Sequence, residues 1–178
     1  MSKQKIIAAV RSEEEFLTAL QSKLSIVFWL TPNLLTVADY VSRAHKAGKK
    51  LFVHMDLAEG IGKDRAGMQF LKAIGVDGII TTRSNIVKMA REQGLFTIQR
   101  FFVVDSQSLE TAIEMVKSSK ADMLEVLPGV VPKVITTLKE KLAISIIAGG
   151  LIETKEELQM VLDSGVFAVS TGHIDFWK

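Results

Sequence analysis

Short apolar runs and longer amphipathic segments alternate along the whole chain. Eight runs of four to eight mostly apolar residues stop at Gly, Pro or small polar residues, which is typical of buried strands. In the segments between them, apolar residues recur every three or four positions, which indicates helices. The predicted strands are residues 6–10, 26–30, 51–56, 78–82, 96–103, 123–127, 144–148 and 167–170.

Capping signals mark where several of the helices begin. Ser12 precedes three glutamates, which suit the positive end of a helix dipole. Thr154 with Glu157 three residues later forms a capping-box pattern. Thr31 and Pro32 predict a helix with proline in its first turn.

Eight strands and seven helices in strict alternation imply a parallel sheet with right-handed crossovers. We therefore expect residues 1–178 to form a single domain of the α/β class, a small (β/α)₈ TIM-like barrel with minimal loops. The last helix would be truncated to residues 173–178 or missing, since a typical barrel of this kind has roughly 250 residues. The alternative is an open doubly wound sheet, although no Gly-x-Gly-x-x-Gly pattern follows the first strand.

Composition narrows the class of protein. Apolar residues make up 48% of the chain, as expected for a sheet covered on both faces. The chain has no cysteine, which excludes disulfides, thiol catalysis and thiolate metal sites, and its net charge of +2 neither requires nor excludes nucleic acid. Residues 1–5 lack a signal-peptide pattern and no apolar run approaches the roughly 20 residues of a membrane span. We expect a cytoplasmic protein with no membrane partner.

Two turns near the end of the chain are rich in small residues. One contains Gly149 and Gly150, and the other contains Ser170, Thr171 and Gly172. Such turns let an anion approach the backbone N–H groups closely. In a (β/α)₈ barrel the loops after the seventh and eighth strands are the usual phosphate site. These five residues are therefore the predicted phosphate ligands.

Polar residues also stand at the ends of other predicted strands, where barrels place their ligands. His54 and Asp56 lie two apart on the third strand, Arg83 follows the fourth, and Arg100 and Glu125 lie within the fifth and sixth. The functional interpretation is a polar cup in which acids hold ligand hydroxyls and arginines hold phosphate. The alternative is a closed ion network, with Arg83 or Arg100 neutralising the buried Glu125.

Further alternatives remain for single residues. Asp56 and Glu125 could hold Mg²⁺, although two carboxylates are weak evidence for a metal site, and we expect no metal. His54 is either a ligand-binding or acid/base group, or a hydrogen-bonded core residue. His173 follows the last turn and is either a phosphate contact or part of a mobile tail. The sequence shows no complete catalytic motif, so a sensor fits as well as an enzyme.

Several segments together resemble the glycerol uptake operon antiterminator family, the regulators that respond to glycerol 3-phosphate. The resemblance extends in order over nearly the whole chain. It is carried by residues 54–61, 79–85, 98–102, 123–132 and 148–152.

The resemblance implies a cytoplasmic bacterial regulator that binds the leader mRNA of glycerol genes and lets RNA polymerase pass a terminator. Glycerol 3-phosphate would be its effector, and no cofactor is implied. The phosphate would lie on the two small-residue turns, with the ligand hydroxyls facing Asp56 and Glu125. A homo-oligomer is compatible with this scheme, and no RNA-binding residues are indicated. The alternatives are an enzyme acting on a triose or sugar phosphate, and a phosphate-binding barrel with neither activity.

Overall fold

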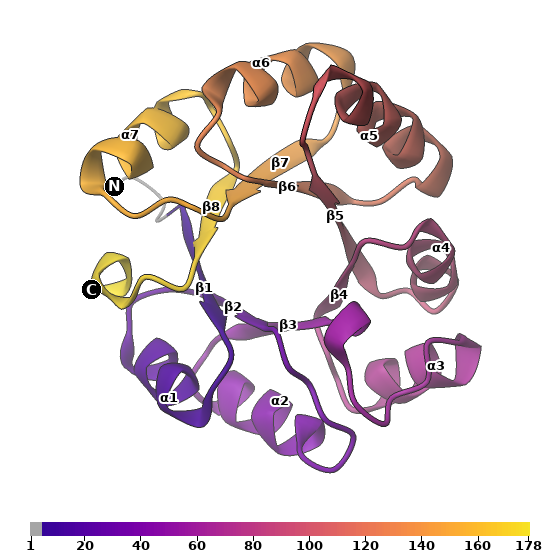
Figure 1. The fold of residues 1–178 in the computed structure, drawn as a ribbon. Coiled ribbons are helices and arrows are strands. Elements are labelled where there is room, and N and C mark those ends of the chain that lie inside the picture. Colours follow the sequence, from indigo (N-terminus) through magenta and orange to yellow (C-terminus); the bar gives the residue numbers. More distant parts are fainter. Residues whose placement is uncertain (1–4) are drawn as a thin grey trace.

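Eight parallel strands close into a barrel surrounded by seven helices (Figure 1). The computed structural model describes residues 5–178, so the first four residues of the predicted domain lie outside the described part. Each strand pairs with the next, and β1 pairs with β8 through Ile6 opposite Val169. This last pairing excludes the open-sheet alternative and confirms the predicted barrel.

The observed strands lie within two residues of their predicted limits. They are β1 (Ile6–Val10), β2 (Ile26–Trp29), β3 (Lys50–His54), β4 (Gly78–Thr81), β5 (Phe96–Phe102), β6 (Met123–Leu127), β7 (Ser145–Gly149) and β8 (Ala168–Thr171). The helices are α1 (Glu13–Gln21), α2 (Val37–Lys46), α3 (Arg65–Ala73), α4 (Ser84–Glu92), α5 (Ser106–Ser119), α6 (Pro132–Lys141) and α7 (Lys155–Asp163), with short 3₁₀ turns η1 (Met55–Leu57) and η2 (Ile174–Trp177).

Two of the predicted helix starts are confirmed. The Ser12 side chain accepts a hydrogen bond from the N–H of Glu15 at the start of α1. Thr154 and Glu157 form the predicted capping box at the start of α7. These caps satisfy N–H groups that the first turn of a helix leaves without partners.

The predicted helix start at Thr31 and Pro32 is wrong. Residues 31–36 form a loop, and α2 begins only at Val37. The reason is a tertiary pairing, because the carbonyl of Pro32 accepts a hydrogen bond from the N–H of Glu59 and the carbonyl of Glu59 accepts one from Leu34. In a helix that began here, the carbonyl of Pro32 would accept a hydrogen bond from within the helix instead.

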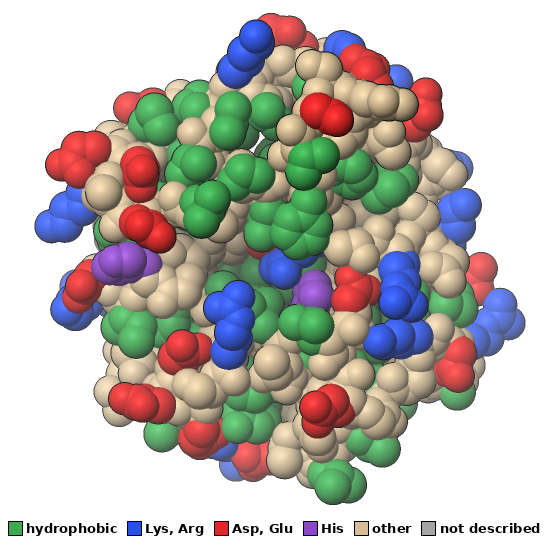
Figure 2. Space-filling view, in the orientation of Figure 1, with side chains coloured by type: hydrophobic (Ala, Val, Ile, Leu, Met, Phe, Trp, Pro, Cys, Tyr) green, Lys and Arg blue, Asp and Glu red, His purple; other side chains and the backbone are tan. Residues whose placement is uncertain are grey.

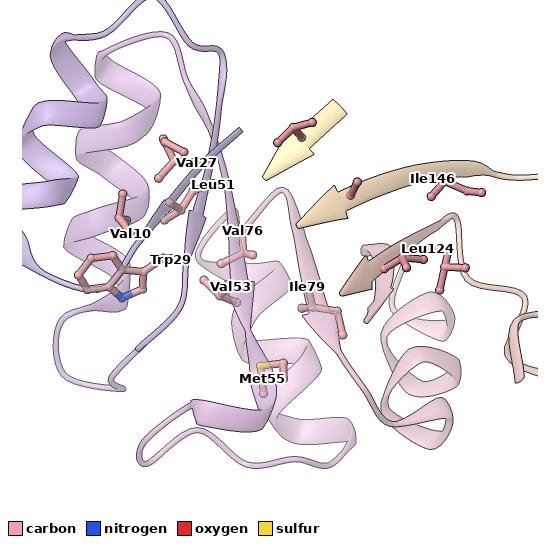
Figure 3. Packing of buried hydrophobic residues seen from close by; sticks show 14 of the residues in the cluster. Val10, Val27, Trp29, Leu51, Val53, Met55, Val76, Ile79, Leu124 and Ile146 are labelled. Atoms are coloured by element: carbon pink, nitrogen blue, oxygen red, sulfur yellow. The ribbon is translucent and has the colours of Figure 1, made fainter. Parts of the chain in front are cut away.

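The hydrophobic core has an outer and an inner part. The outer part lies between strands and helices, and Figure 3 shows Val27, Leu51 and Ile79 among its members. The inner part fills the barrel with side chains from alternate strand positions. Its buried members are Ile7, Ala9, Phe28, Leu30, Phe52, Ile80, Ile98, Ile147 and Ala168.

The short turn η2 stands in place of an eighth helix. It buries Phe176 and Trp177 near β1 and α1. The indole N–H of Trp177 donates to the carbonyl of Thr171 at 3.0 Å, which fixes the segment after β8. The prediction of a truncated last helix is therefore confirmed. Within residues 5–178 no helix is both long enough and apolar enough to span a bilayer.

Candidate ligand-binding site

A cavity of about 390 Å³ lies at the carboxyl end of the barrel, where β1, β2 and β5 to β8 end. Near this end β1 and β8 contribute the small residues Ala9 and Ser170, whereas β5 and β6 contribute Arg100 and Glu125. The small side chains leave the space that the cavity occupies. Its lining consists of Ala9, Arg11, Leu30, Arg100, Glu125, Leu127, Gly150, Leu151, Ile152, Glu153, Ser170, Thr171, Gly172 and His173.

A buried network of three side chains forms one wall of the cavity. Arg100 and Glu125 are paired across β5 and β6, and Arg100 Nε donates to Glu125 Oε2 at 2.7 Å. Ser170 Oγ donates to Glu125 Oε1 at 2.6 Å. Gly149 leaves room for this bond, because a Cβ there would overlap Ser170 Oγ. The pair fixes the guanidinium of Arg100 while its two terminal nitrogens remain for other acceptors.

His54 ends β3, and its imidazole is a buried polar group without a hydrogen-bond partner among the described residues. Its side chain is only 5% exposed, and neither ring nitrogen has a hydrogen-bond partner within the described residues. His54 Nε2 lies 3.9 Å from Asp56 Oδ2, which is too far for a hydrogen bond. Burial, followed by the positive charge of Arg100, lowers the pKa of His54 to about 4. The imidazole is therefore neutral near pH 7.

Asp56 lies in η1 rather than on β3, so the expectation that it follows His54 along one strand face is wrong. The strand stops at His54 because the chain turns there into η1. Asp56 accepts hydrogen bonds from the Thr81 hydroxyl at 2.6 Å and from the Thr82 N–H and hydroxyl at 2.8 and 2.7 Å. Burial alone would raise the pKa of Asp56, but these bonds lower it overall. Its carboxylate thus joins η1 to the end of β4.

The two carboxylates proposed for Mg²⁺ are engaged with protein donors. Asp56 holds the threonines after β4, and Glu125 holds Arg100 and Ser170. No cluster of three His, Asp or Glu suited to a metal ion occurs among residues 5–178. Within the described chain we identify no metal site.

Arg83 lies outside the cavity. It is the exposed N-cap residue of α4, and it forms no ion pair within the part of the chain described. Of the two arginines considered for Glu125, Arg100 is the partner. The predicted polar cup is therefore brought together only in part, with Arg100 and Glu125 at the cavity and His54 and Asp56 beside one another.

The predicted phosphate turns lie on one side of the cavity. Gly150, Ser170, Thr171 and Gly172 line it, and Gly149 is buried behind them. Gly150 and the next residue, Leu151, both have left-handed backbones, with φ of 77° and 59°. The Gly149 carbonyl accepts a bond of 2.6 Å from the N–H of Gly129, which ties the turn to the loop after β6. The assignment of these residues as phosphate ligands stays a prediction.

Two further residues line the cavity that were not among the predicted site residues, Arg11 and Glu153. Arg11 directly follows β1, and its Nη1 lies 3.8 Å from where a Cβ on Gly172 would be. Within residues 5–178 its guanidinium forms no ion pair, and the space-filling view shows basic and histidine side chains around the central hollow (Figure 2). The signal was available, because Arg11 is the first polar residue after the first apolar run. His173 lines the cavity too and stacks on Phe176.

Comparison with known proteins places the chain among regulators. The model of the glycerol-3-phosphate responsive antiterminator family matches residues 6–177. An uncharacterized protein of Escherichia coli K12, YgcP, is 37% identical over 97% of this chain and 91% of its own length.

Two solved structures are similar in both sequence and fold. The glycerol uptake operon antiterminator regulatory protein of Listeria monocytogenes has a TM-score of 0.91 and 34% identity, covering 97% of this chain and 94% of that one. A glycerol uptake operon antiterminator-related protein of Thermotoga maritima has a TM-score of 0.87 and 32% identity, covering 98% of both chains. The chain therefore belongs to the glycerol-3-phosphate responsive antiterminator family.

Proposed function

We propose that this protein binds glycerol 3-phosphate in the cavity at the carboxyl ends of the strands, and that binding changes its affinity for a leader mRNA. The observation that carries the proposal is that two arginines and the two small-residue turns line one cavity. Family membership supports the same effector.

The phosphate would lie between Arg11 and the turns at Gly150 and Gly172. A guanidinium matches the geometry of phosphate oxygens and stays charged at any physiological pH. Arg100 is largely neutralised by Glu125 at 2.7 Å, whereas Arg11 has no acidic partner within the described residues. Arg11 would therefore supply most of the charge that balances the phosphate.

The RNA-binding step is coupled to the effector by thermodynamic linkage. If glycerol 3-phosphate tightens RNA binding by some factor, RNA must tighten glycerol 3-phosphate binding by the same factor. The family description supports an antitermination role.

The enzyme alternative receives less support. The family is one of regulators. Glu125 is engaged on both oxygens, and His54 has no hydrogen-bonded carboxylate to orient it as a base within the described residues.

Calorimetric titration with glycerol 3-phosphate tests the effector, with glycerol and inorganic phosphate as controls. We expect saturable binding that is much tighter than binding of either control. Arg11→Met should weaken it by about tenfold or more, since a charge-assisted hydrogen bond contributes about 1.5–3 kcal/mol. Arg65→Met is the matched control, because Arg65 is exposed and pairs with Glu92 outside the cavity. Absence of binding at millimolar glycerol 3-phosphate would refute the effector.

The RNA step is tested by gel shift with the leader RNA of glycerol genes. The wild-type protein should bind this RNA more tightly with glycerol 3-phosphate than without it. Equal binding with and without the effector would refute the coupling.

A further inference from the structure

We propose that the Glu153 carboxylate accepts hydrogen bonds from the hydroxyl groups of the ligand. These bonds would make the cavity selective for a polyol phosphate over other small phosphate esters. This inference rests on the proposed function, because it takes the cavity to be the site that binds the phosphate. Glu153 was not among the residues predicted for this site.

The other nearby carboxylates are already engaged. Three hydrogen bonds from Thr81 and Thr82 converge on the oxygens of Asp56, which does not line the cavity. Glu125 accepts one bond on each oxygen, from Arg100 and Ser170. A cavity-lining carboxylate with both oxygens free would therefore accept ligand hydroxyls more readily than either of these.

Glu153 fits this role. It is exposed and lines the cavity on the turn between β7 and α7. Its carboxylate makes no hydrogen bond or ion pair within residues 5–178, so both oxygens are available to donors. Its backbone is held in place, because its N–H donates to Glu157 Oε2 at 2.9 Å beside the capping box of α7.

The cavity wall therefore carries both a basic and an acidic side chain. Arg11 follows β1 and Glu153 follows β7, and both line the same space of about 390 Å³. A carboxylate is only an acceptor, so it favours hydroxyl donors and repels a second anionic group. The arrangement fits a small molecule with its phosphate near Arg11 and Gly172 and its hydroxyls near Glu153.

Selectivity among three phosphate esters tests this assignment. The ligands are glycerol 3-phosphate, n-propyl phosphate, which lacks both hydroxyls, and 3-phosphoglycerate, which carries a carboxylate. We expect the wild-type protein to prefer glycerol 3-phosphate to n-propyl phosphate by about tenfold or more, since hydrogen bonds to charged groups contribute about 1.5–3 kcal/mol. Glu153→Gln should reduce that ratio severalfold and increase the affinity for 3-phosphoglycerate.

A control variant and the wild-type affinity for glycerol 3-phosphate together show whether the role of Glu153 or the effector itself is wrong. Glu156→Gln on the first turn of α7 is the control, because Glu156 is exposed and does not line the cavity. A ratio of affinities does not change with the folded fraction of the sample. If the wild-type protein binds glycerol 3-phosphate but Glu153→Gln keeps the wild-type ratios, the assignment of Glu153 is wrong and the effector stands. If the wild-type protein does not bind glycerol 3-phosphate, both proposals are overturned.

Discussion

Acidification should destabilise this protein through His54. Burial and the neighbouring Arg100 lower the pKa of the folded imidazole from 6.5 to about 4. As the pH falls through 6.5, the unfolded chain takes up a proton that the folded protein does not, so protonation favours unfolding. One pKa unit corresponds to about 1.4 kcal/mol, so the full difference makes the folded state less stable by about 3 kcal/mol at pH 4 than at pH 8.

The groups around His54 modify this effect in known directions. The charges of Arg11 and Lys63 add to that of Arg100 in lowering the pKa of His54, whereas Asp56 raises it. Their contributions are contained in the net value of about 4, so the effect remains a loss of stability towards acid.

Urea unfolding followed by circular dichroism at pH 8, 6 and 4.5 measures the effect. The wild-type free energy of unfolding should fall more steeply below pH 6.5 than that of His54→Asn, because the asparagine side chain at position 54 does not titrate. His173→Asn serves as the control, because His173 is exposed, and it should follow the wild type. If wild type and His54→Asn lose the same stability between pH 8 and 4.5, the reasoning about His54 is refuted.

Three further substitutions test the packing of the site by urea unfolding at pH 7. Glu125→Ala should lower the free energy of unfolding by about 3–5 kcal/mol, because it leaves Arg100 buried without its partner; a loss below 1 kcal/mol would contradict this. Gly149→Ala should lower the free energy of unfolding by about 1–3 kcal/mol, because the new Cβ overlaps Ser170 Oγ. The double variant Gly149→Ala/Ser170→Ala should lose less stability than the sum of the two single variants, because the overlapping hydroxyl is gone. Asp56→Ala should cost about 2–3 kcal/mol because it removes the acceptor of three hydrogen bonds, and no loss would show that η1 is held by other contacts.

The barrel could be predicted because its signals are local. Apolar runs, caps and turn residues place all eight strands within two residues, since each depends on neighbours in the chain. The start of α2 could not be predicted in this way. The loop at Pro32 is held by Glu59, and nothing in residues 31–36 reveals that partner.

The site was predicted less completely for the same reason. Gly150 and Gly172 could be placed at the cavity because barrel topology fixes where the last strands end. The choice of Arg100 over Arg83 as the partner of Glu125 depends on strand register, which a sequence does not state. Arg11 was missed although it satisfies the rule that ligands gather at strand ends.

The hydrogen bond between Trp177 and Thr171 makes the fluorescence of Trp177 sensitive to the conformation of the turn after β8. Trp177 is one of two tryptophans, and its indole N–H donates to the carbonyl of a residue that lines the cavity. A shift of the turn after β8 would change that bond and with it the indole emission. In a Trp29→Phe variant all tryptophan emission would come from Trp177, so occupancy of the cavity could be followed by fluorescence without any label.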